Sequence, residues 1–421
     1  MSIEEKQLGP INKVCVVGLG YIGLPTAAFI ADSGISVLGV DINERHVEKI
    51  NNGEMPFFEP GFEALLKSVV ADGHLKADTE VAEADAFIVA VPTPFNDDYS
   101  VNMAYIEAAA KNIAPVLRPG ALVVLESTSP PGTTEKMAEI LVAERPDLST
   151  DPESANRLLV AHCPERVLPG KIMEEMAAND RVIGGLNPLS TDRAKQLYSS
   201  FCNGEMLLTN ATTAEMAKLT ENSFRDVNIA FANELSIISD KLGIDVWELI
   251  ELANHHPRVN ILNPGPGVGG HCIAVDPWFI VSSAQEEAKL IRTAREVNDG
   301  KPAYVIAKIT EAVEAEGADS IAALGIAFKP DIDDLRESPA LSIVQQMAEK
   351  WPEKNILVAE PNVDELPESL TAYQNVQLAD ASHAISSSPV VAVLVDHTPF
   401  KSLDKSVLEG KNVVDTRGMW S

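Results

Sequence analysis

Short apolar runs alternate with helical segments along the first half of the chain. The run KVCVVG at 13–18 ends in glycine, and a helical pattern follows it from about Leu24. Buried strands that alternate with helices predict a parallel, doubly wound α/β sheet. The other apolar runs of this half lie at 36–41, 86–91, 121–126, 158–162 and 181–184, and helical stretches such as 103–117 and 133–145 separate most of them.

The pattern becomes helical near Thr209. Residues 212–242 contain neither proline nor glycine, and their apolar residues recur at helical spacing. This predicts one long helix that ends at Gly243. Most of 244–255 and 285–299 is helical too, and the segment NPGPGVGGHCIAVDP between them is a predicted loop because it is rich in glycine and proline.

A second α/β region begins near residue 320. Its apolar runs again predict parallel strands, at 320–326, 355–359, 390–395 and 412–415. The expected fold class is α/β, with two Rossmann-like doubly wound parallel-sheet domains joined by a central helical region with a long helix. The expected domains are 1–208, 209–302 and 303–421.

Composition limits the classes of function. The 421 residues are 45% hydrophobic and 23% charged, as in an ordinary globular protein that needs no disulfide or metal to hold its core. The net charge of −29 disfavours nucleic acid and anionic membranes, so a phosphate-bearing ligand needs a locally positive site. The first residues lack the features of a signal peptide, and no apolar run reaches the length of a membrane span. We therefore expect a cytoplasmic protein.

The four cysteines are far apart and form no C-x-x-C pair, which argues against a disulfide framework and a structural zinc site. Adjacent His–Cys pairs at 162–163 and 271–272 do not suit one metal, so no metal is expected. Cys15 lies in an apolar strand and looks like a packing residue. Cys272 lies in a glycine-rich loop whose backbone N–H groups could cradle an oxyanion. The pattern leaves Cys272 either a reactive thiol or a second packing residue.

A dinucleotide-binding motif follows the first predicted strand. Gly18 permits a tight turn, Gly20 lets the backbone approach a pyrophosphate, and Gly23 lets the helix pack on the strand. The helix N-terminus then holds the phosphates without a basic side chain. Asp41 ends the second strand, where a carboxylate accepts hydrogen bonds from the adenosine ribose and repels a 2′-phosphate. The cofactor expected is NAD rather than NADP.

Other candidate residues lie where strands end. Arg45 could stack on adenine or be an ordinary exposed helix arginine. Thr93 in VPTP and Thr128 in ESTSPPGTT follow the third and fourth strands, at the sheet edge where ligands bind, although both segments also read as ordinary turns. The segment HCPERVLPG places Glu165 and Arg166 just past another strand.

Lys218 and Asn222 lie four residues apart, on one face of the predicted long helix. Both are donors suited to a developing alkoxide or oxyanion. The alternative is that Lys218 pairs with Glu215 or Glu221 at the surface, a contact worth only a few tenths of a kcal/mol.

These segments together resemble the UDP-glucose/GDP-mannose dehydrogenase family, in the right order and over essentially the whole chain. The resemblance implies NAD in the first domain, the UDP moiety in the last, and a homodimer formed through the long helix. It also implies two successive oxidations without release of the aldehyde. The segments that carry it are GLGYIGLP, VDIN, VPTP, ESTSPPGTT, the Lys218–Asn222 helix, GGHCIAVD and AFKPDIDDLRESP.

The resemblance also assigns roles. Cys272 is the implied nucleophile, Lys218 and Asn222 stabilise oxyanions, Asp276 assists Lys218 or water, and Glu165 is a base or water-positioner. Arg258 resembles an arginine that reaches the sugar nucleotide, within its own subunit or across the dimer. The implied cofactor contacts are Gly18, Gly20, Tyr21, Ile22, Gly23, Asp41, Arg45, Thr93, Thr128 and Arg336, and the implied substrate contacts are Arg166, Lys218, Asn222, Arg258, Gly269 and Lys329.

Within the family, several segments resemble the branch that oxidises UDP-N-acetyl-D-mannosamine to the uronate through a cysteine thiohemiacetal and thioester. UDP-glucose members carry a second glutamate four residues after the one matching Glu165, and this chain has Pro169 there. The sugar pocket must therefore differ from theirs. UDP-GlcNAc and UDP-glucose remain alternative substrates. A β-hydroxyacid dehydrogenase and a non-catalytic sugar-nucleotide-binding dimer are more distant alternatives.

Overall fold

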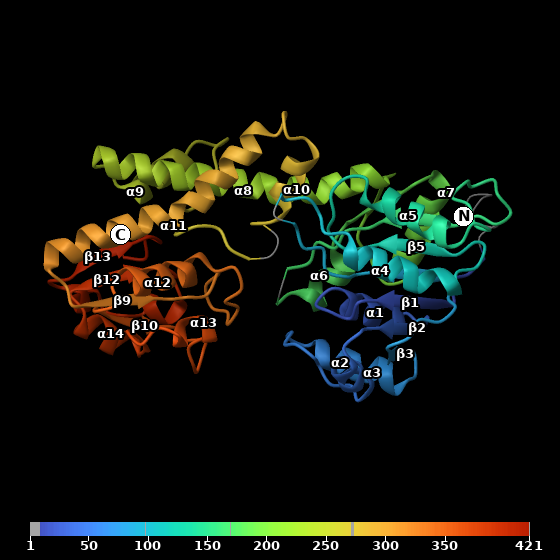
Figure 1. Ribbon diagram of the computed structural model, residues 1–421, viewed down its shortest axis with the longest axis horizontal. Helices are drawn as coiled ribbons and strands as arrows, with labels where there is room; N and C mark the ends of the chain where they lie inside the picture. Colours follow the sequence, from blue (N-terminus) through green and yellow to red (C-terminus); the bar gives the residue numbers. More distant parts are fainter. Residues whose placement is uncertain (1–8, 97, 169, 271–272, 421) are drawn as a thin grey trace. The chain divides into compact units, whose positions relative to one another are not determined.

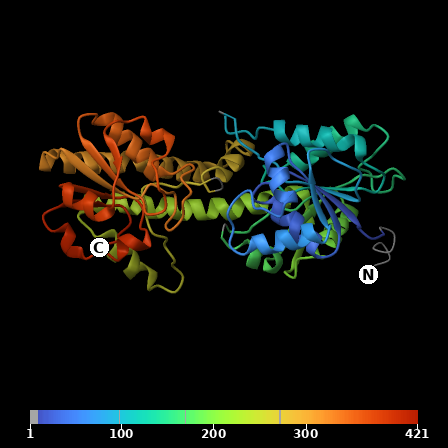
Figure 2. The ribbon, with the colours of Figure 1, turned by 90° about the horizontal axis from the view of Figure 1, so that it is seen from below.

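The computed structural model describes residues 9–96, 98–168, 170–270 and 273–420. It divides into two compact units, Met1–Glu221 (unit 1) and Asn222–Ser421 (unit 2). The division falls inside helix α8 (Ala211–Leu242), so the residues expected to form a middle region at 209–302 are shared between the two units. Figures 1 and 2 show the sheet and the covering helices of each unit.

Unit 1 is built on an eight-stranded sheet with the order β3-β2-β1-β4-β5-β6-β7-β8. Neighbouring strands run parallel except β6 and β7, where His162 pairs with Gly184 in an antiparallel ladder. This one reversal is the only difference from the expected parallel sheet among the strand pairs that the structure describes. The strands are β1 (Lys13–Val17), β2 (Ser36–Val40), β3 (Leu75–Asp78), β4 (Ala86–Val89), β5 (Leu122–Leu125), β6 (Leu159–His162), β7 (Arg181–Gly185) and β8 (Met206–Asn210).

Both faces of this sheet are buried. On β1, Val14 and Val16 belong to one apolar core, whereas Cys15 and Val17 belong to the core on the other face, because successive side chains of a strand alternate in direction. Cys15 is fully buried, as expected of a packing residue. The covering helices are α1 (Gly23–Asp32), α2 (Glu44–Asn51), α3 (Phe62–Ala71), α4 (Ala104–Ile113), α5 (Thr133–Glu144), α6 (Ile172–Ala178) and α7 (Pro188–Tyr198).

Unit 2 contains a five-stranded, fully parallel sheet with the order β11-β10-β9-β12-β13. The first strand of this sheet in chain order, β9, lies in the middle, between the second strand, β10, and the fourth, β12. The first five strands of unit 1 are arranged in the same order. The expectation of two Rossmann-like sheets is therefore confirmed. The strands are β9 (Ser320–Leu324), β10 (Asn355–Ala359), β11 (Val376–Leu378), β12 (Val390–Val393) and β13 (Asn412–Asp415), and the smaller helices are α12 (Pro339–Lys350), α13 (Glu368–Thr371), α14 (Ala381–Ser387) and α15 (Thr398–Lys401).

Three further helices complete unit 2 beside the second part of α8. They are α9 (Val246–Asn254), α10 (Asp276–Ser283) and α11 (Lys289–Glu316). Helix α10 begins inside the expected loop, with Pro277 in its first turn, where a missing N–H costs nothing. Helix α11 continues through Pro302, past the expected boundary at 302/303, and its later turns bury Val305, Ile309 and Val313.

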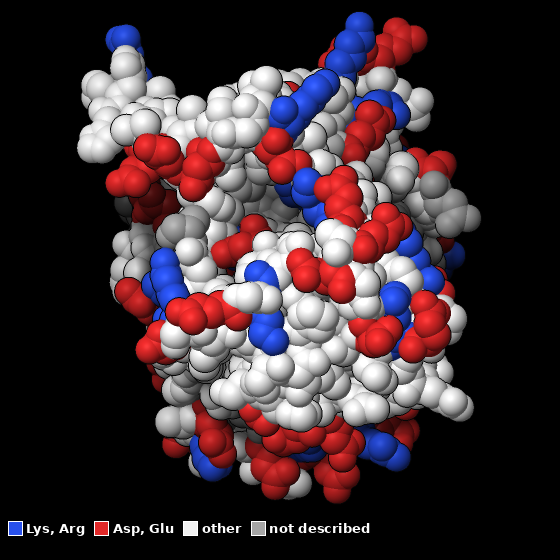
Figure 3. All heavy atoms as spheres, turned by 90° about the vertical axis from the view of Figure 1, so that its left-hand side faces the viewer, with Lys and Arg blue, Asp and Glu red and all other residues white. Residues whose placement is uncertain are grey.

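The surface is strongly acidic, as the net charge requires. Figure 3 shows acidic side chains distributed between basic ones over the face that it draws. No helix in the described part of the chain is both long and apolar enough to cross a membrane.

Candidate active site

Each glycine of the nucleotide motif has the environment that its position requires. Gly18 has φ +94°, and a Cβ there would lie 2.4 Å from the Ala90 carbonyl oxygen. A Cβ on Gly23 would lie 1.9 Å from the Gly18 carbonyl oxygen, so only glycine allows α1 to approach β1 this closely. A Cβ on Gly20 would meet nothing within 4 Å, which leaves the space that a pyrophosphate needs. This loop therefore fits NAD.

Asp41 connects the end of β2 to the glycine loop. Its Oδ2 accepts from the Leu19 N–H at 2.8 Å, and its Oδ1 accepts from the Asn43 N–H at 2.9 Å. A carboxylate has roughly four acceptor sites, so these two bonds leave capacity for ribose hydroxyls. Arg45 is exposed in the first turn of α2, whose N-terminus is capped by Asn43.

Tyr21 connects the glycine loop to the segment that follows Glu165. Its hydroxyl donates to Glu59, whose Oε2 also accepts from the Gly170 N–H at 3.0 Å and whose Oε1 accepts from the Ile172 N–H at 3.0 Å. Glu59 is buried although it lies in a loop, and nothing in its sequence context predicted that. Ile22 is the residue that immediately precedes α1.

The loops that follow β4 and β5 meet at the carboxyl edge of the sheet. The Thr93 hydroxyl donates to the Thr128 carbonyl oxygen at 2.7 Å, and both threonines are half-buried. The structure thus brings together two residues that the sequence placed separately at this edge.

Glu165 is buried, and both of its carboxylate oxygens accept hydrogen bonds. Its Oε2 accepts from Arg181 Nη1 at 2.7 Å, and its Oε1 accepts from the N–H groups of Arg166 at 2.7 Å and Val167 at 3.2 Å. Arg181 also lies over the rings of Tyr198 and Phe201. These bonds hold the carboxylate in one orientation. To act as a base, Glu165 would have to accept a proton while it keeps these partners, or exchange them for others.

Glu126, at the end of β5, is buried next to this pair. It accepts from the hydroxyls of Thr26 and Tyr198, each at 3.0 Å. Burial, with the negative charge of Glu165, raises the pKa of Glu126 to about 8, while Arg181 opposes the shift. Glu126 is therefore mainly a neutral acid at neutral pH.

The two glutamates that could have paired with Lys218 have other partners. Glu215 is buried and accepts from the N–H groups of Gly132 and Thr134, each at 2.7 Å, and so caps the start of α5. Glu221 forms an ion pair with Arg166, at 2.6 Å between Oε1 and Nη1. The surface pairing of Lys218 that the sequence allowed is absent from the described part of the chain, and Arg166 lies beside the same helix.

In unit 2, Asn222 and Asp276 are joined directly. Asn222 Nδ2 donates to Asp276 Oδ2 at 2.5 Å, and the Asp276 side chain is buried at the N-terminus of α10, where the helix dipole favours a carboxylate. Cys272 lies outside the described residues, as does Pro169. The structure therefore fixes the chain from Ile273 onward and leaves the thiol itself undescribed.

The remaining predicted substrate residues lie in loops of unit 2. A Cβ on Gly269 would lie 2.4 Å from the Glu337 carbonyl oxygen, so the glycine-rich loop packs closely on the segment 328–339. Lys329 and Arg258 are exposed. Arg336 is exposed too, and its guanidinium donates to both carboxylate oxygens of Asp334, at 2.8 and 2.6 Å.

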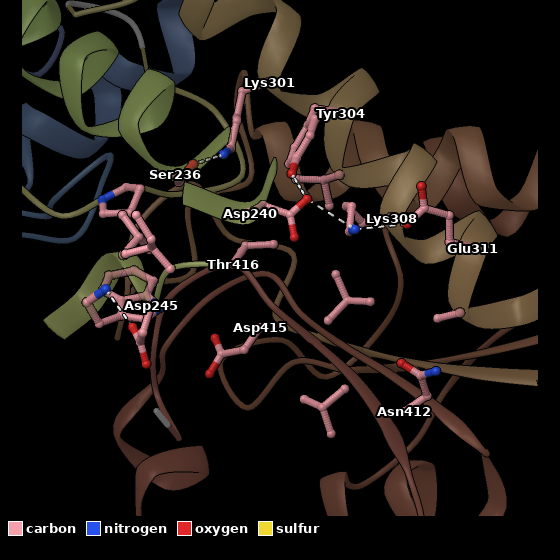
Figure 4. A pocket seen from close by; sticks show the side chains of 18 of the residues that line it. Ser236, Asp240, Asp245, Lys301, Tyr304, Lys308, Glu311, Asn412, Asp415 and Thr416 are labelled. Atoms are coloured by element: carbon pink, nitrogen blue, oxygen red, sulfur yellow. Dashed lines mark hydrogen bonds and ion pairs between the residues drawn. The ribbon is translucent and has the colours of Figure 1, made fainter. Parts of the chain in front are cut away.

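A cavity of about 590 Å³ lies elsewhere in unit 2, between α8, α11 and β13. Figure 4 shows Lys301 directed at Ser236, and Tyr304 and Lys308 directed at Asp240. Burial lowers the pKa of Lys301 to about 8. None of the predicted site residues is among the described residues that line this cavity.

Sequence reasoning missed several buried polar residues around these sites. On α8, Asp226 and Asn233 continue the row begun by Lys218 and Asn222, at spacings of four and seven residues. Polar residues that recur at helical spacing on one face of α8 were the signal that could have identified them. Arg181 and Glu126 carried no comparable signal, because each stands alone beside an apolar run.

Comparison with known proteins covers the whole chain. Residues 12–202, 212–300 and 322–421 match the NAD binding, central and UDP binding domains of the UDP-glucose/GDP-mannose dehydrogenase family. A UDP-N-acetyl-D-mannosamine dehydrogenase of Campylobacter jejuni is 58% identical over 93% of this chain and 97% of its own. An NDP-N-acetyl-D-galactosaminuronic acid dehydrogenase of Ralstonia nicotianae is 54% identical over 97% of this chain and 96% of its own.

A solved structure has the same fold. The UDP-D-ManNAc dehydrogenase of Pyrococcus horikoshii is 39% identical, with a TM-score of 0.86 over 97% of this chain and 96% of that one. The glycine loop, with its open approach at Gly20, agrees with the NAD binding domain assigned to residues 12–202. The chain therefore belongs to the UDP-glucose/GDP-mannose dehydrogenase family, with NAD as its cofactor.

Proposed function

We propose that this protein oxidises the C6 hydroxyl of UDP-N-acetyl-D-mannosamine to the carboxylate, with two molecules of NAD⁺ and one of water. One substrate molecule then yields UDP-N-acetyl-D-mannosaminuronate, two NADH and three protons. The observation that carries this proposal is the 58% identity to a dehydrogenase of that substrate over nearly the full length of both chains.

The chemistry assigned to the protein centres on Cys272. NAD held by the glycine loop would supply the hydride acceptor for both oxidations. The Cys272 thiolate adds to the aldehyde carbon after the first oxidation, and the thiohemiacetal that results is oxidised to a thioester in the second. Water then breaks the C–S bond, which releases the carboxylate and restores the thiol.

Lys218 and Asn222 have the role of oxyanion stabilisers. They lie one turn apart on α8, and neither glutamate beside Lys218 is available to neutralise it. The Asp276 carboxylate accepts a hydrogen bond from the Asn222 side-chain amide and so holds that amide in one orientation. The Asp276 carboxylate also remains the candidate to assist Lys218 or water.

Glu165 is assigned to positioning water rather than to taking a proton from it. Its ion pair with Arg181 occupies one carboxylate oxygen, and its second oxygen holds the backbone of the loop that carries Arg166. Arg166, Arg258, Lys329 and the Gly269 loop are assigned to the substrate, and Thr93, Thr128 and Arg336 to the cofactor side.

The division into 1–208 for NAD, 209–302 for catalysis and dimerisation, and 303–421 for the UDP-sugar is part of the proposal, as is a cytoplasmic location. Support for a homodimer comes from α8. Two apolar residues of this helix, Leu219 and Ala230, are buried within the subunit. An exposed apolar stripe nevertheless recurs at intervals of seven, seven and four residues, at Phe224, Phe231, Ile238 and Leu242.

A second candidate substrate is UDP-N-acetyl-D-galactosamine, which differs from UDP-ManNAc at both C2 and C4, because the Ralstonia nicotianae relative is named for the corresponding uronic acid and is 54% identical. NADH formation with UDP-ManNAc, UDP-GalNAc, UDP-GlcNAc and UDP-glucose separates these candidates. The proposal predicts the highest kcat/KM with UDP-ManNAc and little turnover when NADP⁺ replaces NAD⁺. Preference for another sugar would overturn the substrate assignment, and no NADH with any sugar would overturn the reaction.

A further inference from the structure

Helix α8 buries polar side chains along one face, beyond the residues assigned to the reaction. Asp226 and Asn233 are both fully buried and lie four and eleven residues after Asn222. Helical geometry places all three on the same side of α8. Most buried polar groups in proteins are hydrogen-bonded, so the partners of this row indicate what it holds.

Asn233 connects α8 to the glycine-rich loop and to α11. Its Oδ1 accepts from the Gly265 N–H at 2.9 Å, and its Nδ2 donates to Asn298 Oδ1 at 2.8 Å. Asn298 Nδ2 in turn donates to Asp226 Oδ1 at 2.8 Å. The Gly265 N–H thus lies at one end of a chain of buried hydrogen bonds between side-chain amides and the Asp226 carboxylate.

Arg295 brings the same network to the other end of the loop. Its guanidinium is buried, and Nη1 donates to Asp226 Oδ1 at 2.6 Å and to the Ile273 carbonyl oxygen at 3.5 Å. Asp226 therefore links Arg295 and Asn298, which lie one turn apart on α11. One network contacts the backbone seven residues before Cys272 and one residue after it.

We propose that Asn233 and Arg295 are positioning residues for the reaction at Cys272, because they hold the backbone at Gly265 and at Ile273, on either side of Cys272 in the sequence. The inference rests on the proposed function, in which Cys272 is the nucleophile. The loop needs such anchors because glycine is conformationally free, and Gly267 and Gly270 have φ of +151° and +85°. A reacting atom displaced by about 1 Å loses on the order of 10²-fold in rate.

The test compares Asn233→Ala with Asn228→Ala in the full-length enzyme. Asn228 lies on the same helix, but its Nδ2 only donates to the Phe224 carbonyl oxygen of its own turn. Three quantities are measured: steady-state turnover, the affinity for NAD⁺, and the rate at which iodoacetamide alkylates Cys272 as a function of pH, located by mass spectrometry.

We expect Asn233→Ala to lower kcat by on the order of 10²-fold. The pH midpoint of Cys272 alkylation should shift from the wild-type value, because the loop that carries the thiol is no longer anchored at Gly265. Affinity for NAD⁺ should be unchanged in both variants, and Asn228→Ala should match the wild type throughout. Unchanged turnover and an unchanged alkylation profile in Asn233→Ala would overturn the inference.

Failure of the proposed function gives a different pattern. If Cys272→Ser retains turnover, Cys272 is not the nucleophile, whatever Asn233→Ala does.

If Asn233→Ala does not fold, Asn233→Asp keeps the acceptor for the Gly265 N–H and should show an intermediate alkylation midpoint. Hydrogen exchange in the wild-type enzyme provides a check without any variant, since fast exchange of the Gly265 amide would contradict its bond to Asn233.

Discussion

Glu165 and Arg181 form an ion pair in the interior of unit 1, with 2.7 Å between Oε2 and Nη1 and both side chains almost completely buried. Glu165 follows β6 and Arg181 begins β7, so the pair closes the segment between these two strands. That segment contains Arg166, which reaches α8 through Glu221. The pair therefore stabilises the loop to which substrate contacts are assigned.

Removal of the Glu165 carboxylate should strongly destabilise the fold. Glu165→Ala leaves the Arg181 guanidinium charged and buried without its partner, and we expect the free energy of unfolding to fall by roughly 3–5 kcal/mol in urea titrations. Glu63→Ala is the matched control, because Glu63 pairs with Lys67 on the exposed surface of α3. Its cost should be only about 0.2–0.5 kcal/mol. Equal costs for the two variants would show that the buried pair adds nothing.

Glu126 should make stability depend on pH. Its folded-state pKa of about 8 lies above its ordinary value of 4.5, so between these values the native state holds a proton that the unfolded chain has released. The contribution of Glu126 to the free energy of unfolding must therefore fall as pH rises from 4.5 to about 8, by at most about 1.4 kcal/mol per pH unit.

Urea titrations at pH 5, 6.5 and 8 measure this effect. Glu126→Gln cannot ionise, so its stability relative to the wild type should improve steadily from pH 5 to pH 8. Glu144→Gln, at an exposed position on α5, should show no such trend. A constant difference between Glu126→Gln and the wild type would mean that Glu126 is ionised in the folded protein.

The motif glycines should separate cofactor binding from folding. A methyl group at Gly23 would overlap the Gly18 carbonyl oxygen, so Gly23→Ala should lower the melting temperature. A methyl group at Gly20 meets no protein atom but occupies the approach to the pyrophosphate. Gly20→Ala should therefore keep the wild-type melting temperature and bind NAD⁺ at least about tenfold more weakly, a loss of about 1.4 kcal/mol. Unchanged NAD⁺ affinity in Gly20→Ala would argue against this loop as the pyrophosphate site.

The apolar stripe of α8 should govern assembly. Phe231 is half-exposed at the centre of the stripe, and Phe231→Asp places a charge where two copies of the helix would meet. Light scattering at micromolar concentration should give a dimer for the wild type and a monomer for Phe231→Asp. Tyr105→Asp, at an equally exposed aromatic position of α4, should remain dimeric. A monomeric wild type would refute the interface.

Much of the fold was predictable because parallel strands buried on both faces are continuous apolar runs. The predicted runs in both halves became β1, β2, β4 to β7, β9, β10, β12 and β13. The edge strands β3, β8 and β11 were missed, since LKAD, MLLTN and VQL are partly polar or exposed and lack that signal. The length of α11 was missed because Pro302 normally ends a helix, and only tertiary packing shows that this one continues.

The candidate site was predictable where spacing within one element carries the chemistry. The glycine loop, Asp41 and the Lys218–Asn222 pair are local patterns of this kind. The bond between Asn222 and Asp276 joins residues 54 positions apart, and the pairing of Glu165 with Arg181 depends on the antiparallel pairing of β6 with β7. Such contacts are set by topology, which no local spacing reveals.

The number of NADH molecules formed per UDP-sugar tests the central claim most directly. A limiting, known amount of UDP-ManNAc is converted to completion with excess NAD⁺ by the wild-type enzyme and by Cys272→Ser, with Cys202→Ala as a control at a buried thiol. The account predicts two NADH per sugar and a uronate product for the wild type and Cys202→Ala. For Cys272→Ser it predicts turnover lower by several orders of magnitude. One NADH per sugar with free aldehyde from the wild type, or two NADH at a near-normal rate from Cys272→Ser, would contradict it.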